Sequence, residues 1–537
     1  MVAAGVAAFR GCLGVGYFAD DYALLGAVER GVDWRAPLPV GTGGYFRPLL
    51  LASFLPGDAP RLQHGLSLLL HLGNGLLVAA VARLAGCRPI LAGSIALGFL
   101  LHPLVVTNVF WLAGRGDSLC ALFYLGGVLA FLGYLRAGSA WMLWATGAAV
   151  VLSALAKETG LTLILALGAV WLLLRTGGGG DDGRPLVPPE RLGAAGRGLA
   201  GVAALTVLLA LVLGLVFWRR APAGAWQGPA GPAGVLLVAA NAVLLRIDEY
   251  DLRRWGLAYP GLRWAGAAAG AALAAGVAAV AFRLAGRRGV LRIALLASLP
   301  AAPLLPLLAI GWARERHVYL TWALAMVAVA LFLGRAHGVA RDRDRLQRLS
   351  AWAGLALAPL LAWASIARAS IWEENAAYLE RSCASFRERL AGAPPDLPVL
   401  AIAVPFSRAE APLYSNDAAE ALGYCLDGDF GPLDRLHAYS GLALAKPAAE
   451  LEPAVAAVDR EGTRTFVRRT DPREAYFRRL VDRRPGPPSG DELAELRVTG
   501  LAPTGDVSAF ELAIDPAARG LVLDVGADGW REVARYE

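Results

Sequence analysis

Two adjacent carboxylates stand near the start of the chain, where its first apolar run ends. They are Asp20 and Asp21, within residues 17–22, which read YFADDY. Carboxylates at a membrane boundary cost free energy unless they are solvated, paired or used in function. The pair is therefore either an ordinary solvated start of a loop, since carboxylates usually face solvent, or a site that supplies a general base.

Further charged residues follow where later apolar runs end. A lysine there is unusual, because only Lys157 and Lys446 are lysines among the 51 basic residues. These positions hold Arg47, His64, Arg115, Asp117, Lys157, Glu158, Arg314, Glu315, Arg316 and His317. Such groups suit transfer from a phosphate-bearing lipid, because a carboxylate can deprotonate the attacking hydroxyl and cations can stabilise charge on the leaving phosphate.

The composition indicates a polytopic membrane protein. Of 537 residues, 56% are hydrophobic and 18% are charged, whereas soluble domains carry about a quarter charged residues. The net charge is +7, but the arginines lie mostly in short loops between apolar runs, so they indicate topology and no nucleic-acid partner is expected. The five cysteines lack a zinc spacing, and Cys383 can pair with Cys425 if their region is extracytoplasmic.

Apolar runs of about 20 residues predict eleven membrane helices. The predicted spans are 2–18, 63–84, 91–111, 118–136, 141–156, 160–174, 199–218, 263–283, 290–310, 318–334 and 350–367. The positive-inside rule places arginine-rich loops such as 335–348 in the cytoplasm, with the N-terminus inside. Residues 368–537 then lie outside, and 234–262 are expected to hold an interfacial or re-entrant helix.

The composition changes near residue 368. Short alternating runs such as 399–404 and 520–525, separated by glycine and proline turns, predict strands. The predicted fold class is an α-helical polytopic membrane protein with a small C-terminal extracytoplasmic α/β or β-rich domain. The predicted parts are a membrane domain at 1–367, a helical connector at 368–395 and a soluble periplasmic domain at 396–537.

Seven short motifs, in this order, closely resemble those of the C-type (GT-C) glycosyltransferases. They are Asp20-Asp21-Tyr22, Tyr45-Phe46-Arg47-Pro48-Leu49, His64 with His71 and Asn74, His102-Pro103, Trp111-Leu112-Ala113-Gly114-Arg115-Gly116-Asp117, Ala156-Lys157-Glu158 and Glu315-Arg316-His317-Val318-Tyr319-Leu320. The resemblance covers about residues 15–380. The branch it resembles is that of the protein O-mannosyltransferase relatives with lumenal tetratricopeptide repeats and their bacterial homologues. The chain departs from that branch because the repeats are missing.

The resemblance implies a polyprenyl-phosphate-linked sugar as donor, transfer with inversion, and a catalytic aspartate in the first outer loop. Asp20 is then the expected general base, with Asp21 as the alternative or as a positioning partner. Asp117 is expected to be a second acidic residue that orients Arg115 or the acceptor. Mannose as the sugar enters only through the resemblance.

The resemblance also implies a set of residues that bind the donor phosphate. These are Arg47, Arg115, Lys157, Arg316 and His317, with Glu158, Glu315 and His64 in supporting roles. Arg47 is alternatively part of the architecture of the first loop, and Glu158 is alternatively only the group that neutralises Lys157. The family usually has a tyrosine where this chain has His317.

Neither a metal nor a cofactor is predicted, because arginine and lysine alone can stabilise a monophosphate leaving group. Some GT-C enzymes bind a divalent cation, so a cation stays an alternative. His64, His71 and Asn74 share a helical face, where hydrogen bonding between helices is favoured over a metal site. His102-Pro103 is interpreted as a helix distortion with a satisfied imidazole.

The expected partners are the lipid-linked sugar, a protein or glycan acceptor, and the lipid of a bacterial inner membrane. A transporter or flippase is the competing class, although transporters place charges near the membrane midplane and contain internal repeats. A non-catalytic scaffold would leave Asp20 and Asp21 dispensable. A glycan ligase on the same fold is harder to exclude than either.

Overall fold

The computed structural model describes residues 1–29, 31, 46–176, 187–218, 289–310, 315–334 and 343–394, and the strands and one helix found within 397–536. The predicted helix at 263–283 and the predicted interfacial helix within 234–262 lie outside these residues. The chain divides into two compact units. The first consists of Met1–Leu13, Asp33–Leu38 and Gly43–Ala369, and the second of Gly14–Val32, Pro39–Thr42 and Ser370–Glu537.

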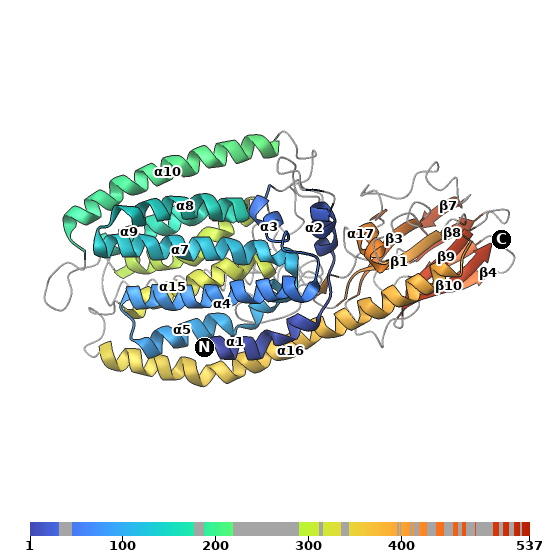
Figure 1. Cartoon of the computed structure of the whole chain (residues 1–537), viewed down its shortest axis with the longest axis horizontal. Helices are drawn as coiled ribbons and strands as arrows, with labels where there is room; N and C mark the ends of the chain where they lie inside the picture. The colour runs from blue at the N-terminus through green and yellow to red at the C-terminus, as the bar shows by residue number, and fades with distance from the viewer. Residues whose placement is uncertain are drawn as a thin grey trace. The chain divides into compact units, whose positions relative to one another are not determined.

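The first unit is a bundle of helices (Figure 1). Its α-helices are α1 (Val2–Phe9), α3 (Pro48–Ala52), α4 (Pro60–Ala85), α5 (Pro89–Leu100), α6 (Val106–Phe110), α7 (Arg115–Ala137), α8 (Ala140–Ala156), α9 (Leu163–Thr176), α10 (Pro189–Trp218), α14 (Leu305–Ile310), α15 (Tyr319–Gly334) and the first part of α16 (Arg343–Ala391). Its 3-10 turns are η1 (Arg10–Gly14), η2 (Pro103–Val105), η3 (Leu112–Gly114), η4 (Glu158–Thr162), η5 (Ala302–Leu304) and η6 (Glu315–Val318). Helix α7 packs against α4 and α8, and α15 packs against α4, α5 and α7.

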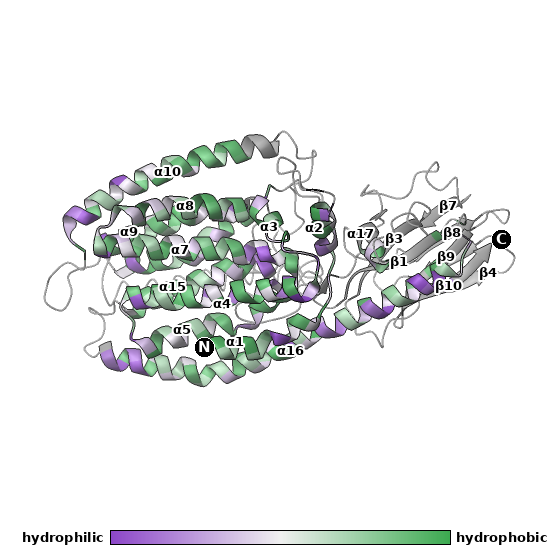
Figure 2. Ribbon diagram, viewed as in Figure 1, coloured by the Kyte–Doolittle hydropathy of each residue, from purple (hydrophilic) through white to green (hydrophobic). Residues whose placement is uncertain are grey.

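Seven helices in the described part of the chain are long and apolar enough to cross a membrane. They are Pro60–Ala85, Leu112–Ala137, Glu158–Thr176, Pro189–Leu213, Gly289–Leu308, Arg316–Gly334 and Asp344–Ala391. A bent pair, α5 with the helical residues Pro103–Phe110, makes an eighth if it is counted as one span. Apolar residues dominate the bundle helices (Figure 2). These features indicate a multi-pass membrane protein, and the predicted number of eleven spans is not confirmed.

Two predicted spans fall below the length of a full membrane span in the structure. The span predicted at 2–18 is an apolar helical segment that ends at Gly14, and its last turn is the 3-10 turn η1. Three glycines, Gly11, Gly14 and Gly16, lie in or just after this turn. Glycine is a poor helix former. Helix α8 has 17 residues and also falls below the length of a full span.

The bend after α5 lies at His102-Pro103, where a distortion was predicted. Proline lacks an amide hydrogen and cannot continue the helix, and the two helical segments are bent by 49°. His102 Nδ1 accepts a hydrogen bond from the backbone N–H of Leu104 at 3.2 Å. The imidazole also packs on Trp322, with 4.3 Å between the ring centroids. The structure therefore confirms a distorted helix with a satisfied imidazole.

Polar side chains join α4, α5, α7 and α15. His71 Nε2 lies 3.1 Å from the Leu100 carbonyl oxygen and therefore donates to it. The other ring nitrogen then accepts from the Tyr319 hydroxyl at 2.9 Å. Asn74 Nδ2 donates to the same hydroxyl at 3.1 Å and to the Ser118 carbonyl oxygen at 2.9 Å. Hydrogen bonding between helices is thus confirmed for His71 and Asn74, and no metal-binding group of three or more His, Cys, Asp or Glu occurs among the described residues.

The second unit combines helices with two sheets. Its helices are α2 (Asp20–Glu29), α16 from Ser370 onward, and α17 (Ala418–Cys425). Its strands are β1 (Val399–Arg408), β2 (Ala411–Pro412), β3 (Leu436–Leu444), β4 (Val455–Asp459), β5 (Arg464–Arg468), β6 (Arg478–Arg479), β7 (Val498–Pro503), β8 (Ala509–Ile514), β9 (Gly520–Gly526) and β10 (Gly529–Tyr536). The six-stranded sheet has the order β10-β9-β1-β3-β6, with β2 also paired to β1, and the four-stranded sheet has the order β4-β5-β8-β7.

Strand β1 pairs in parallel with β3 and β9, whereas the pairs β1–β2, β9–β10 and β3–β6 are antiparallel, so the larger sheet is mixed. The smaller sheet is antiparallel throughout. Residues Gly14–Val32, with the acidic pair, group with the C-terminal part, whereas the sequence placed them in the membrane domain.

Candidate active site

Asp117 and Lys157 form a buried ion pair in the helical unit. Asp117 lies in the first turn of α7, and Lys157 follows the last residue of α8 with an extended backbone. The Lys157 Nζ atom lies 2.6 Å from Asp117 Oδ1, and the two side chains are 3% and 4% exposed. Burial lowers the pKa of the Lys157 ammonium, while the Asp117 carboxylate acts to raise it. The sequence had suggested Arg115 or the acceptor as the partner of Asp117.

Arg47 and Glu158 form a second ion pair beside the first. Arg47 precedes α3, and its Nε and Nη2 atoms lie 3.0 Å and 2.5 Å from the two carboxylate oxygens of Glu158. The pair is therefore bidentate, and bidentate arginine–carboxylate pairs are among the strong hydrogen-bonded interactions in proteins. Arg47 also lies close enough to Lys157 for its positive charge to lower the pKa of the Lys157 ammonium. Glu158 therefore binds Arg47, and the carboxylate that neutralises Lys157 is that of Asp117.

Arg316 is the third cation of this region. It lies in η6, and its guanidinium carbon sits 3.9 Å from the centroid of the Trp111 ring, a cation–π contact. Its Nε donates to His317 Nε2 at 3.3 Å, and its carbonyl oxygen accepts from Asn108 at 3.3 Å. The positive charge of Arg316 also lowers the pKa of Lys157.

We call Arg47, Lys157 and Arg316 the cation cluster. Lys157 pairs with Asp117 and Arg47 with Glu158, while the Arg316 guanidinium lies over the Trp111 ring. The residues come from the start of α3, the end of α8 and the turn η6. A cluster of this kind can stabilise a phosphate as negative charge develops on it.

Arg115 has a different environment from the one expected. Its Nε donates to Ser67 Oγ, and its Nη1 and Nη2 atoms donate to oxygens of Ser53 and Gln63 at 2.8 to 3.1 Å. Its guanidinium also lies over the Phe54 ring at 4.6 Å, and the residue is fully buried. The N–H groups of Arg115 thus donate to oxygens of the protein itself, and the side chain holds the start of α7 to α4. We therefore do not include Arg115 among the residues that bind the donor phosphate.

The remaining predicted residues of the helical unit are His64, His317 and Glu315. His64 and His317 are buried, in α4 and η6 respectively. Glu315 is the first residue of η6. His317 contacts Arg316 directly, whereas the supporting roles of His64 and Glu315 stay predictions.

Asp20 and Asp21 open helix α2 in the second unit. The preceding Ala19 has a φ of 47°, a left-handed conformation that is uncommon outside glycine. Asp21 is fully buried, and its Oδ2 accepts the backbone N–H of Phe18 at 3.1 Å. The contact satisfies a backbone amide that lies just before the helix starts. Asp21 therefore has a structural partner.

Asp20 differs from its neighbour. Its Oδ1 atom is shielded from solvent and has no hydrogen-bond partner among the described residues. A buried acceptor without a partner costs about 1–3 kcal/mol, and strained backbone such as that of Ala19 is concentrated at functional sites. Asp20 thus presents a carboxylate oxygen that can accept a proton from a bound hydroxyl group.

Two aromatic residues far along the chain lie against this acidic segment. Trp372 of α16 packs edge-on against Phe18, with 5.1 Å between the ring centroids. Tyr424 of α17 lies against Tyr17 and Tyr22, at 6.2 Å and 5.4 Å. Neither residue was predicted from the sequence to belong to the site. The only sequence signal near Tyr424 was the possible pairing of the adjacent cysteine.

Comparison with known proteins yields loose structural likenesses. No protein-family model and no curated protein matches the sequence. The solved structures with partial similarity include arabinofuranosyltransferase AftD from Mycobacteria, at 16% identity and a TM-score of 0.43, covering 78% of this chain and 32% of AftD. ArnT from Cupriavidus metallidurans has 13% identity and a TM-score of 0.41, covering 84% of this chain and 94% of ArnT.

The oligosaccharyltransferase of Archaeoglobus fulgidus has 13% identity and a TM-score of 0.34, covering 74% of this chain and 61% of that one. This chain therefore spans about a third of the length of AftD and less than two thirds of the archaeal protein. Likenesses at these TM-scores are too loose to assign a function.

Proposed function

We propose that the protein is a membrane glycosyltransferase that moves a monosaccharide from a polyprenyl-phosphate donor to an extracytoplasmic acceptor. The observation that carries this proposal is the buried Asp20 carboxylate oxygen without a hydrogen-bond partner among the described residues. Asp20 takes the proton of the acceptor hydroxyl while the hydroxyl oxygen attacks the anomeric carbon of the sugar. The bond from that carbon to the phosphate oxygen breaks, the phosphate leaves with the electron pair, and the configuration inverts.

The cation cluster supplies the other requirement of the reaction, stabilisation of the leaving phosphate. Its three cations suit a lipid monophosphate, and the guanidinium of Arg316 lies over the ring of Trp111. Asp117 and Glu158 position Lys157 and Arg47 in this proposal. His317 supports the orientation of Arg316 through their direct contact.

The donor class and the cellular location follow from the motif resemblance and from loop charge. We propose a bacterial inner-membrane protein with a cytoplasmic N-terminus and with 396–537 outside. Mannose is the first sugar to test, since the resembled branch uses it. The acceptor is a protein hydroxyl or a glycan, and the C-terminal domain is the proposed site of acceptor recognition.

The test is transfer of radiolabelled sugar from a panel of polyprenyl-phosphate donors in membranes that contain the full chain. Asp20→Asn is expected to lower kcat by about 100-fold or more, because general-base catalysis contributes about 10²–10⁴-fold. Glu190→Gln, a carboxylate in the first turn of α10, is the matched control and should leave transfer unchanged.

Two outcomes would contradict the proposal. Wild-type activity in Asp20→Asn would remove Asp20 as the base. If the wild-type chain consumes no donor of the panel, uptake or flipping of a lipid-linked sugar in proteoliposomes becomes the measurement, and transport would replace transfer as the function.

A further inference from the structure

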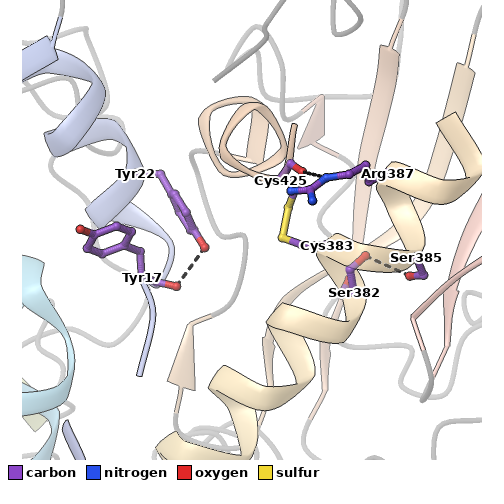
Figure 3. The surroundings of a disulfide bond; sticks show 7 residues. All are labelled: Tyr17, Tyr22, Ser382, Cys383, Ser385, Arg387 and Cys425. Carbon is purple, nitrogen blue, oxygen red and sulfur yellow. Dashed lines mark hydrogen bonds between the residues drawn. A yellow bond between two sulfur atoms is a disulfide. The ribbon is translucent and has the colours of Figure 1, made fainter. Parts of the chain in front are cut away.

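A disulfide ties the helix that carries Tyr424 to the long helix α16. Cys383 of α16 and Cys425 of α17 are joined, with 4.9 Å between their Cα atoms and a separation of 42 positions in the sequence. Arg387, one turn further along α16, donates from Nε to the carbonyl oxygen of Cys425 at 2.9 Å. Figure 3 shows the disulfide between Cys383 and Cys425 and the hydrogen bond from Arg387 to Cys425. The end of α17 is therefore attached to α16 at two points.

Tyr424 precedes the bonded cysteine and reaches both ends of the acidic helix α2. Its ring contacts Tyr17 and Tyr22, the residues on either side of the acidic pair. Its hydroxyl donates to Glu29 Oε1 at 2.7 Å, at the last residue of α2. The Tyr22 hydroxyl in turn donates to the Tyr17 carbonyl oxygen at 3.0 Å, which closes the acidic segment into a compact turn (Figure 3).

The acidic segment needs such support because its own conformation is unfavourable. Ala19 has a left-handed backbone, which L-residues adopt at a cost. Asp20 places a carboxylate oxygen out of solvent without a hydrogen-bond partner among the described residues, which also costs free energy. Helix α2 has 10 residues, and helices shorter than about 12–15 residues are marginal on their own. Conformations of this kind persist only where the surroundings enforce them.

We propose that Tyr424 is a positioning residue for Asp20 and that the Cys383–Cys425 disulfide keeps Tyr424 in place. This inference rests on the proposed function, in which Asp20 is the general base. The C-terminal domain thus contributes directly to the acidic site, in addition to any recognition of the acceptor. Transfer then depends on an oxidised disulfide, which fits a location outside the reducing cytoplasm.

Kinetics of three variants of the full chain test the inference. Tyr424→Ala is expected to lower kcat about tenfold or more with little change in donor KM, because small misplacements of a catalytic group cost up to about 100-fold. Tyr424→Phe keeps the ring contacts and loses only the bond to Glu29, so it should retain most of the activity. Tyr134→Ala removes a tyrosine ring from α7 in the other unit and serves as the control for a general loss of packing.

The disulfide is tested with a reductant. Dithiothreitol should lower kcat of the wild type and of Tyr424→Phe. The double variant Cys383→Ser with Cys425→Ser should start at the lowered value and not respond to the reductant. A purely structural role of Tyr424 would reduce the amount of folded protein and leave kcat per folded molecule unchanged, and this result would overturn the inference.

Hydrogen–deuterium exchange gives a readout that does not depend on activity. Amides of residues 17–29 should exchange about tenfold faster in Tyr424→Ala and in the reduced wild type, as expected for local opening, while amides of α4 stay protected. Unchanged exchange together with unchanged kcat would refute the inference and leave the glycosyltransferase proposal intact. If the wild type transfers no sugar, the proposed function fails, and the exchange data alone decide whether Tyr424 and the disulfide hold α2.

Discussion

The ammonium of Lys157 lies 2.6 Å from Asp117 Oδ1, 40 residues away in sequence, and not against its neighbour Glu158. The backbone at Lys157 is extended, with φ −163° and ψ 142°. Successive side chains of an extended backbone point to opposite sides, so Lys157 and Glu158 diverge toward different partners. Glu158 binds Arg47 instead. The two pairs link α3, α7 and the junction of α8 with η4.

This ion pair predicts a strong dependence of stability on both partners. Lys157→Met or Asp117→Leu alone should destabilise the protein by about 3–5 kcal/mol, because each leaves a buried charge without its counterion. The double variant should recover most of that loss. Thermal unfolding in detergent measures both, and a double variant as unstable as the sum of the two single variants would contradict the buried pair.

Arg115 should behave as a structural residue. Arg115→Lys keeps the positive charge but cannot reproduce the planar fork of donors, so we expect a loss of about 2–4 kcal/mol in stability, comparable with breaking several charged hydrogen bonds. Donor KM should not change in the fraction that remains folded. An increase of donor KM without a change in thermal stability would instead return Arg115 to the phosphate site.

Substitutions of Asp20 and Asp21 should have different effects on stability. Asp21→Ala removes the acceptor of the Phe18 amide and should lower stability by about 1 kcal/mol, comparable with the loss of a helix cap. Asp20→Asn should not lower stability, because the affected oxygen has no partner among the described residues. Chemical denaturation of both variants, beside transfer assays, checks this. Equal losses of stability would argue against different roles.

Ala19 offers a test of backbone strain. Glycine adopts a φ of 47° without a steric cost, so Ala19→Gly should be neutral or stabilising by up to about 1 kcal/mol after the entropy of the unfolded chain is counted. Ala19→Val should be destabilising, because β-branched residues are disfavoured there. Thermal unfolding of the two variants gives the order, and a reversed order would mean that Ala19 is not left-handed in the protein.

Arg316 should be the cation on which transfer depends most. Arg316→Gln is expected to lower kcat/KM by about 100-fold, the usual effect of removing one group that stabilises developing charge. Arg316→Lys should restore part of this, since it keeps the charge and a contact with Trp111. Arg83→Gln, in the last turn of α4, is the control. Equal activity of Arg316→Gln and the control would exclude Arg316 from the phosphate site.

Several features of the helical unit could be predicted from the sequence because their causes are local. Proline at position 103 breaks a helix wherever it occurs, and the bend was predicted there. His71 and Asn74 share one face of a helix, so their use between helices follows from periodicity. Runs of apolar residues likewise predicted where most of the described spans lie. The short first segment was mispredicted because hydropathy alone does not register its glycines.

The sequence by itself determined that the chain is apolar enough to cross a membrane several times and that charged motifs stand at helix ends. The tertiary structure decided how those charges pair: Lys157 with Asp117, Glu158 with Arg47, and Arg115 with neutral oxygens. It also decided that Tyr424, 402 residues after Tyr22, lies against the acidic helix. These contacts join residues that are far apart in the sequence, and they form only when the helices pack and the disulfide closes. Local sequence patterns therefore could not predict them.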